Sequence, residues 1–243
     1  MNKVVIVTGG SRGIGAATSR LLAEQGYGVC VNYRARSAEA EALVADIAAR
    51  GGRAFAHAAD VSQEGEVIAL FNAAEQALGP VTHLVNNAGM LATQARLAEM
   101  ELARFARVLN VNVLGCFLCC REAARRLGQG GAIVNVSSVA ARTGSPNEYI
   151  DYAAAKGAID TLTKGLSLEL AAAGIRVNGV RPGFIHTEMH ADGGEPERVA
   201  RLSPQIPLQR GGRPEEVAAA IAWLLSDAAS YVTGSFIDIA GGR

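Results

Sequence analysis

The 243-residue sequence is poor in aromatic side chains, which make up 5% of it, and it has no excess of charge of either sign. Lysine and arginine together number 23, and so do aspartate and glutamate, so the formal net charge is zero. A neutral chain sets up no broad field that would attract nucleic acid or an anionic membrane surface. We therefore expect neither of them as a partner.

Cysteine is also scarce, with four residues in the chain. Cys116, Cys119 and Cys120 crowd together and could suggest a metal cluster, but they lie in an apolar segment with no neighbouring histidine or aspartate. Small buried packing residues are the better interpretation. We expect no disulfide and no metal site.

The sequence contains no apolar run that approaches membrane-spanning length, and its first residues resemble a short strand rather than a secretory signal. We therefore expect a cytoplasmic protein. The abundance of alanine and glycine suits helices packed closely against a sheet, and the length suits one domain.

Apolar β-branched runs alternate with helical patterns along the whole chain, without a compositional break. This repetition predicts an α/β fold: a single doubly wound Rossmann domain over residues 1–243, with a seven-stranded parallel sheet and helices on both faces. Strands are expected at 4–7, 28–32, 53–60, 82–86, 132–136, 174–181 and 235–239, and helices at 16–25, 37–50, 64–78 and 101–127 and from 151 and 214. Ser37 is expected to cap the second helix. Residues 186–210, rich in glycine, proline and charge, are predicted to form a lid over the substrate.

The first predicted strand runs into Thr8-Gly-Gly-Ser-Arg-Gly-Ile-Gly15, after which a helix begins. A strand, a glycine turn and a helix in this order can bind a pyrophosphate, because unpaired N–H groups and the helix dipole favour an anion there. The spacing of Gly9, Gly13 and Gly15 differs from the GxGxxG pattern. Such turns also serve merely to pack a helix on a strand, but the position after the first strand favours a dinucleotide site.

The end of the second predicted strand indicates which nicotinamide cofactor is used. An acidic residue there would bind the ribose hydroxyls of NAD, whereas this chain has Asn32, Tyr33 and Arg34. Arg34 and Arg12 could receive a 2′-phosphate, so we predict NADP(H), although either arginine could instead be a solvated surface residue. Asp60, after the third strand, is placed to contact the adenine or to cap the next helix.

Tyr152 and Lys156 stand four residues apart in an alanine-rich helical segment, so their side chains share one face. A nearby ammonium would lower the pKa of the phenol and let Tyr152 exchange protons with a substrate. Such a pair can also arise by chance in an alanine-rich helix. Tyr149 is excluded from this role because Ala153 stands four residues beyond it. Asn112, inside an apolar helix, is either a structural hydrogen-bonding group or part of a site.

Taken together and in this order, the motifs resemble those of the short-chain dehydrogenase/reductase family over essentially the whole chain. They are Thr8 to Gly15, Asp60-Val61, Asn86-Asn-Ala-Gly89, Asn112, Ser138, Tyr152-Ala-Ala-Ala-Lys156, Arg181-Pro-Gly183 and Thr187. By this resemblance Asn112, Ser138, Tyr152 and Lys156 form a catalytic tetrad. The expected cofactor contacts are Gly9, Ser11, Arg12, Gly13, Ile14, Gly15, Asn32, Tyr33, Arg34, Asp60, Val61, Asn87, Ala88, Gly89, Tyr152, Lys156, Pro182, Gly183, Ile185 and Thr187.

The resemblance implies an oxidoreductase that interconverts a carbonyl and a secondary alcohol by hydride transfer. Ser138 would hydrogen-bond the carbonyl, Tyr152 would protonate the alkoxide, and Asn112 would hold a water for proton supply. The chain is most similar to bacterial β-ketoacyl-thioester reductases and glucose 1-dehydrogenase-like members. A 3-oxoacyl thioester or small ketone is therefore the favoured substrate, with a sugar dehydrogenase as the alternative.

A catalytically silent NADP-binding regulatory protein is a further alternative, which the retained tetrad disfavours. A structural oligomer that binds no nicotinamide is another. The family resemblance also implies a homotetramer built through the long helices that contain Asn112 and Tyr152.

Overall fold

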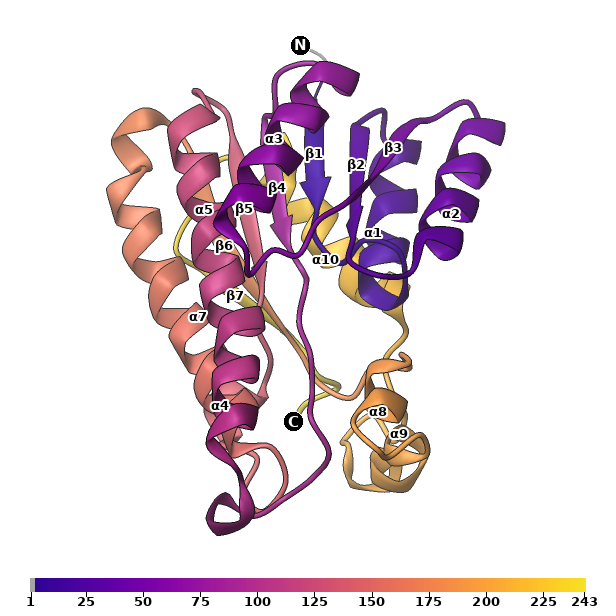
Figure 1. Cartoon of the computed structure of the whole chain (residues 1–243), viewed down its shortest axis with the longest axis vertical. Helices are drawn as coiled ribbons and strands as arrows, with labels where there is room; N and C mark the ends of the chain where they lie inside the picture. The colour runs from indigo at the N-terminus through magenta and orange to yellow at the C-terminus, as the bar shows by residue number, and fades with distance from the viewer. Residues whose placement is uncertain (1–2) are drawn as a thin grey trace.

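The computed structural model describes residues 3–243, which form a seven-stranded sheet with helices on both faces (Figure 1). The strands are β1 (Val4–Val7), β2 (Gly28–Tyr33), β3 (Arg53–Ala58), β4 (His83–Asn86), β5 (Ala132–Val136), β6 (Arg176–Pro182) and β7 (Phe236–Ile239). Their order is β3-β2-β1-β4-β5-β6-β7, and every neighbouring pair is parallel. The predicted fold class is confirmed.

Ten α-helices occur within the described residues. They are α1 (Gly13–Glu24), α2 (Ser37–Ala49), α3 (Glu64–Leu78), α4 (Leu102–Leu109), α5 (Gly115–Arg126), α6 (Ala140–Thr143), α7 (Ile150–Glu169), α8 (Met189–Asp192), α9 (Arg198–Leu202) and α10 (Pro214–Leu225). The predicted cap at Ser37 is wrong: Ser37 is the first residue of α2, and Arg36 occupies the cap position without a side-chain bond to the helix. The sequence patterns also did not predict the short helix α6.

The two faces of the sheet are buried under different helices. Along β1, Val4 and Ile6 pack into a cluster with residues of α3, α5 and α7. Val5 and Val7 point the other way and pack with residues of α1, α2 and α10. Because successive side chains in a strand point to opposite faces, a strand covered on both sides needs a continuous apolar run. This double burial explains the uninterrupted β-branched segments in the sequence.

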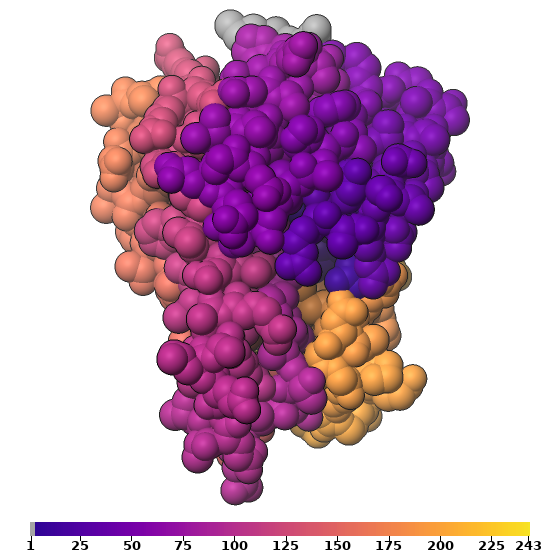
Figure 2. Space-filling model, viewed as in Figure 1, coloured from indigo at the N-terminus to yellow at the C-terminus, as the bar shows by residue number. Residues whose placement is uncertain are grey.

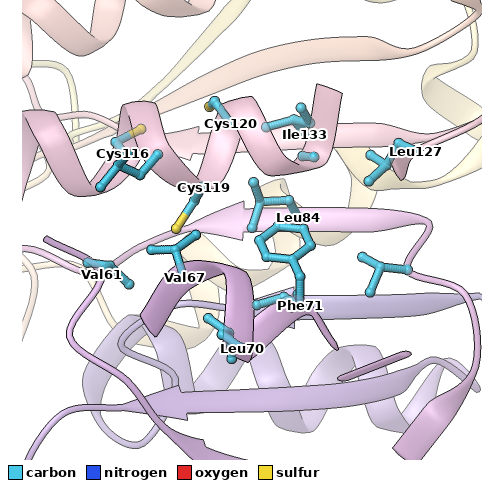
Figure 3. Packing of buried hydrophobic residues seen from close by; sticks show 14 of the residues in the cluster. Val61, Val67, Leu70, Phe71, Leu84, Cys116, Cys119, Cys120, Leu127 and Ile133 are labelled. Carbon is cyan, nitrogen blue, oxygen red and sulfur yellow. The ribbon is translucent and has the colours of Figure 1, made fainter. Parts of the chain in front are cut away.

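The cysteines belong to the apolar core. Figure 3 shows Cys119 of α5 pointing toward Val67 of α3, whereas Cys116 and Cys120 point to the other side of the helix, where each sulfur lies 3.7 Å from the amide oxygen of Asn135. All four cysteines of the chain are free and buried, and burial raises the pKa of Cys30 to about 12. The predicted packing role is therefore confirmed. Within residues 3–243 no group of histidine, cysteine and acidic side chains is arranged to hold a metal ion.

The helix predicted at 101–127 is more apolar than the sequence led us to expect. α4, a π-helical turn at Asn110–Leu114 and α5 run on as one helix, Leu102–Arg126, of 25 residues with a mean hydropathy of 1.4 in its most apolar window. By length and composition it could cross a membrane, so the expectation that no segment approaches that length is wrong. Core helices of soluble proteins meet the same criterion, and the inner face of α5 packs against the sheet.

The strands all end at one edge of the sheet, the lower edge in Figure 1. The helices α8 and α9 and the first turns of α4 extend beyond that edge, and Figure 2 shows a hollow between the orange segment of α8 and α9 and the magenta segments. In parallel α/β sheets, ligands bind outside the carboxyl ends of the strands. The fold therefore predicts a ligand site at this edge.

Candidate active site

The glycine turn brings the start of α1 very close to the end of β1. Gly9 and Gly13 have φ of 58° and 51°, values that side chains with a Cβ rarely adopt. A Cβ on Gly15 would lie 2.2 Å from the carbonyl oxygen of Gly9, so only glycine fits there. Among the described residues, no side chain caps α1 at Arg12. The first N–H groups of the helix therefore remain available to an anion.

A cavity of about 450 Å³ opens over this turn and over the carboxyl ends of β2, β3 and β4. Most of the predicted cofactor contacts line it: Gly9, Ser11, Arg12, Gly13, Ile14, Asn32, Tyr33, Arg34, Asp60, Val61, Asn87, Ala88, Gly89 and Thr187. Gly15 lies beneath the turn. The glycine cradle, the free helix terminus and the basic lining fit a dinucleotide.

Asn32 and Asp60 also form hydrogen bonds within the protein, which leaves fewer of their polar atoms available to a ligand. The side chain of Asn32 accepts from the N–H of Gly9 at 3.3 Å and donates to the carbonyl of Ala59 at 3.0 Å. It thus ties the glycine turn to the end of β3. Asp60 accepts from the N–H and the hydroxyl of Ser62, at 2.9 and 2.7 Å, and so stabilises the turn before α3 rather than capping the helix itself.

A second cavity, of about 430 Å³, adjoins the first. Five residues line both: Ile14, Asn87, Leu91, Thr187 and Met189. Ser138, at the end of β5, and Tyr152 and Lys156, on α7, line the second cavity, together with Pro182, Gly183 and Ile185 from the end of β6. The structure thus brings three of the four predicted catalytic residues to one space beside the dinucleotide cavity.

Burial shifts the pKa values of Tyr152 and Lys156. It raises the pKa of Tyr152 to about 12, and the interaction with Ser138 offsets only part of that rise. Burial also lowers the pKa of Lys156 to about 8, against the opposing effects of Cys116 and Asp160. The expected lowering of the tyrosine pKa by the lysine is not found. The ammonium donates to the carbonyl of Val136 at 2.7 Å and lies 5.5 Å from the centre of the Tyr152 ring.

Asn112 is 1% exposed and lies in the π-helical turn between α4 and α5. Its amide donates to the carbonyls of Met90 and Val108, at 3.1 and 3.0 Å, and its oxygen accepts from the N–H of Met90 at 3.1 Å. A Cβ on Gly89 would lie 2.8 Å from that oxygen and 3.7 Å from Nζ of Lys156. Asn112 therefore fixes the segment after β4 next to Lys156, and its side chain is already engaged with backbone groups.

The start of α7 is held by an ion pair that no sequence pattern suggested. Asp151 is 4% exposed and accepts from Nε and Nη2 of Arg104 on α4, at 2.7 and 3.2 Å. The same carboxylate accepts from the backbone N–H of Tyr152 at 2.9 Å. Breaking a buried ion pair is costly because it leaves an uncompensated charge. The pair of Arg104 and Asp151 therefore keeps the start of α7, and with it Tyr152, in place.

The outer wall of the second cavity was also missed. Arg198 of α9 is 5% exposed and pairs with Glu148 and Glu195. Its guanidinium lies over the rings of Tyr149 and Phe184, 4.9 and 5.3 Å from their centres. Tyr149 thus forms part of the wall of the cavity that Tyr152 also lines. These residues come from distant segments, and nothing in their local sequence groups them.

The fold and the site together define a class: a dinucleotide-binding oxidoreductase with a phenol and an ammonium at the carboxyl ends of its strands. A family model described as enoyl-(acyl carrier protein) reductase matches residues 9–243. The chain belongs to the short-chain dehydrogenase/reductase family, as its motifs indicated, and is therefore an oxidoreductase that uses a nicotinamide cofactor.

Three relatives match this chain over nearly its whole length. The uncharacterized oxidoreductase YgfF of Escherichia coli is 61% identical, over 99% of both chains. The 3-oxoacyl-[acyl-carrier-protein] reductase FabG of Staphylococcus aureus is 39% identical, over 100% of this chain and 98% of its own. Glucose 1-dehydrogenase 2 of Bacillus subtilis is 38% identical, over 99% and 94%. Both branches suggested by the motifs are thus represented.

A solved structure agrees with the fold. A short-chain dehydrogenase from Burkholderia cenocepacia, in complex with NADP, superimposes with a TM-score of 0.92 at 36% identity, covering 99% of this chain and 97% of that one.

Proposed function

We propose that this protein is a single-domain NADP(H)-dependent oxidoreductase that interconverts a carbonyl and a secondary alcohol, with Tyr152 as acid/base and a substrate lid at 186–210. The observation that carries the proposal is the convergence of Ser138, Tyr152 and Lys156 on a cavity that shares its wall with the dinucleotide cavity. When bound, the nicotinamide supplies or accepts the hydride.

The residues of the second cavity have complementary roles in carbonyl reduction. Ser138 donates a hydrogen bond to the substrate oxygen and orients it. Tyr152, whose pKa of about 12 keeps it protonated at neutral pH, gives its proton to that oxygen as negative charge develops. Lys156 places a positive charge one helical turn away, which attracts the negative charge left on the phenol after proton transfer, although burial keeps the resting pKa of Tyr152 above its ordinary value.

The use of NADP(H) rests on the basic lining of the first cavity. Arg34 is exposed there and forms no ion pair with any described acidic residue, so it is available to a 2′-phosphate. Arg12 and Arg36 line the same cavity. The family relative solved with NADP supports the same assignment.

For the substrate we favour a 3-oxoacyl thioester or a small ketone, on the similarity to the 3-oxoacyl reductase. A sugar dehydrogenase is the second candidate, on the similarity to glucose 1-dehydrogenase. A panel of 3-oxoacyl thioesters, ketones and aldoses, followed by the absorbance of the reduced nicotinamide, separates the two. A regulatory protein without catalytic activity would bind NADPH but convert none of these substrates.

The pH dependence of the reaction should follow Lys156. Because its pKa is lowered to about 8, the side chain is charged below that pH and neutral above it. Tyr152 stays protonated throughout this range, so kcat/KM for carbonyl reduction should be level up to about pH 8 and then fall by about tenfold per pH unit.

The Lys156→Arg variant is the matched control, since arginine keeps its charge over the whole range. We expect a lower rate with no break near pH 8. A wild-type profile that is flat from pH 7 to 10 would remove the lysine from the mechanism.

We also propose a cytoplasmic homotetramer built through the long helices that contain Asn112 and Tyr152. Leu109, Leu114 and Phe117 of the Leu102–Arg126 helix are large apolar side chains that are 44%, 43% and 45% exposed. On α7, Ile150 and Leu168 are 37% and 68% exposed. An apolar surface of this kind is typical of a face that another subunit covers.

Phe117→Glu should therefore reduce the tetramer to a smaller species, because it places a charge in an apolar interface. Native mass spectrometry or light scattering measures the change. Leu97→Glu, at a position 57% exposed outside the long helices, is the control and should leave the assembly intact. A tetramer that persists in Phe117→Glu would place the interface elsewhere.

A further inference from the structure

The lid is tied to the phosphate side of the dinucleotide cavity by ion pairs. Nη1 of Arg12, in the glycine turn, donates to the carboxylate of Glu188 at 3.0 Å, and Nη2 pairs with Asp192. Arg36, just after β2, lies 3.2 Å from the same carboxylate of Glu188. All four side chains line the first cavity. Two lid carboxylates thus face two arginines across the mouth of the predicted cofactor site.

A phosphate group could replace the carboxylates in these ion pairs. The side chain of Arg12 is 32% exposed, and those of Glu188 and Asp192 are 59% and 41% exposed. Ion pairs with this much solvent are individually weak. A phosphate group carries more charge than a carboxylate and offers three acceptor oxygens, so it is the stronger partner for a guanidinium. A phosphate that reaches these arginines would displace the carboxylates.

We propose that Glu188 and Asp192 are specificity-determining residues of the cofactor site, which hold Arg12 and Arg36 in the ligand-free protein and give them up to the phosphates of NADP(H). This rests on the proposed use of NADP(H). The two acids weaken cofactor binding, since their pairs must break first and their charges then repel the phosphates. They also hold the lid against the glycine turn until that exchange occurs.

The consequence can be tested with Glu188→Gln combined with Asp192→Asn, which keeps side-chain size and removes both charges. By fluorescence titration, we expect NADPH to bind about three- to tenfold more tightly to this double variant than to the wild type. NADH, which lacks the 2′-phosphate, should gain less. Binding of NADPH should also depend less on salt in the wild type than in the variant, because the wild-type arginines lose carboxylate partners as they gain phosphate.

A second measurement needs no cofactor. Limited proteolysis between about 189 and 210 should be faster in the ligand-free double variant than in the ligand-free wild type, because the lid has lost its ties to the glycine turn. Glu197→Gln is the matched control: Glu197 lies on the same lid, is exposed, and forms no ion pair with any described residue. It should match the wild type in both assays.

If the double variant binds NADPH no more tightly than the wild type, the proposed exchange of carboxylates for phosphates is wrong. Unchanged cleavage of the ligand-free lid in this variant would also refute it. Failure of the proposed cofactor would look different. Wild-type protein would then bind NADPH and NADH equally, while the double variant would still show faster cleavage of the lid in the absence of any cofactor.

Discussion

Replacing Tyr152 by phenylalanine is expected to lower kcat for carbonyl reduction by about a thousandfold, while the affinity for NADPH stays within about twofold of the wild type. The substitution removes the hydroxyl that we propose as the proton donor and keeps the ring that lies beside Lys156. In the proposed mechanism this hydroxyl, which its pKa of about 12 keeps protonated, is the acid that faces the substrate oxygen next to Ser138. Steady-state rates and a binding titration measure the two effects separately.

Tyr149→Phe is the matched control, because it deletes the same atom three residues earlier on the wall of the same cavity. The hydroxyl of Tyr149 donates to the carbonyl of Gly193 at 3.4 Å, and no lysine stands one turn beyond it. Its loss should change kcat by less than about tenfold. A Tyr152→Phe variant that turns over at a near wild-type rate would show that another group donates the proton.

The second large effect is expected at the cofactor. Arg34→Ala should lower kcat/KM for NADPH by about tenfold to a hundredfold and barely alter that for NADH, because a hydrogen bond between charged groups contributes roughly 1.5–3 kcal/mol. The preference for NADPH should also weaken as salt screens the pair. Rates with both cofactors at several salt concentrations test this.

Arg53→Ala serves as the control for Arg34, since Arg53 is also exposed but lies at the opposite end of β3, away from the cavity. It should leave the discrimination unchanged. Equal use of NADPH and NADH by the wild type, or unaltered discrimination in Arg34→Ala, would mean that Arg34 points to solvent.

The sequence predicted the fold well because the sheet is buried on both faces. A strand such as β1, with alternate side chains in two different cores, must be apolar throughout, and such runs are easy to recognise. The glycine pattern likewise predicted the turn between β1 and α1, where the backbone at Gly15 lies too close to Gly9 for any side chain. Because parallel strands end at one edge of the sheet, the sequence also predicted that Arg34, Ser138 and Tyr152 lie along that edge.

What the sequence could not show depends on contacts between distant segments. The pair of Arg104 with Asp151 joins residues 47 positions apart, and that of Arg12 with Asp192 joins residues 180 apart. The protonation of Tyr152 was misjudged for a similar reason. Its spacing from Lys156 is visible in the sequence, whereas the burial of both groups and the carbonyl of Val136 that binds the ammonium are not.

We propose that this chain moves a hydride between the cofactor and a carbonyl carbon at the cavity of Tyr152. The most direct measurement uses NADPH that carries deuterium at the transferable position, a panel of 3-oxoacyl thioesters and ketones, and mass spectrometry of the alcohol formed. We predict one deuterium on the carbinol carbon of the product with the wild type and almost no product with Tyr152→Phe. Product without deuterium would show that the hydride does not come from the cofactor, and equal labelling by the phenylalanine variant would show that Tyr152 is not the proton donor.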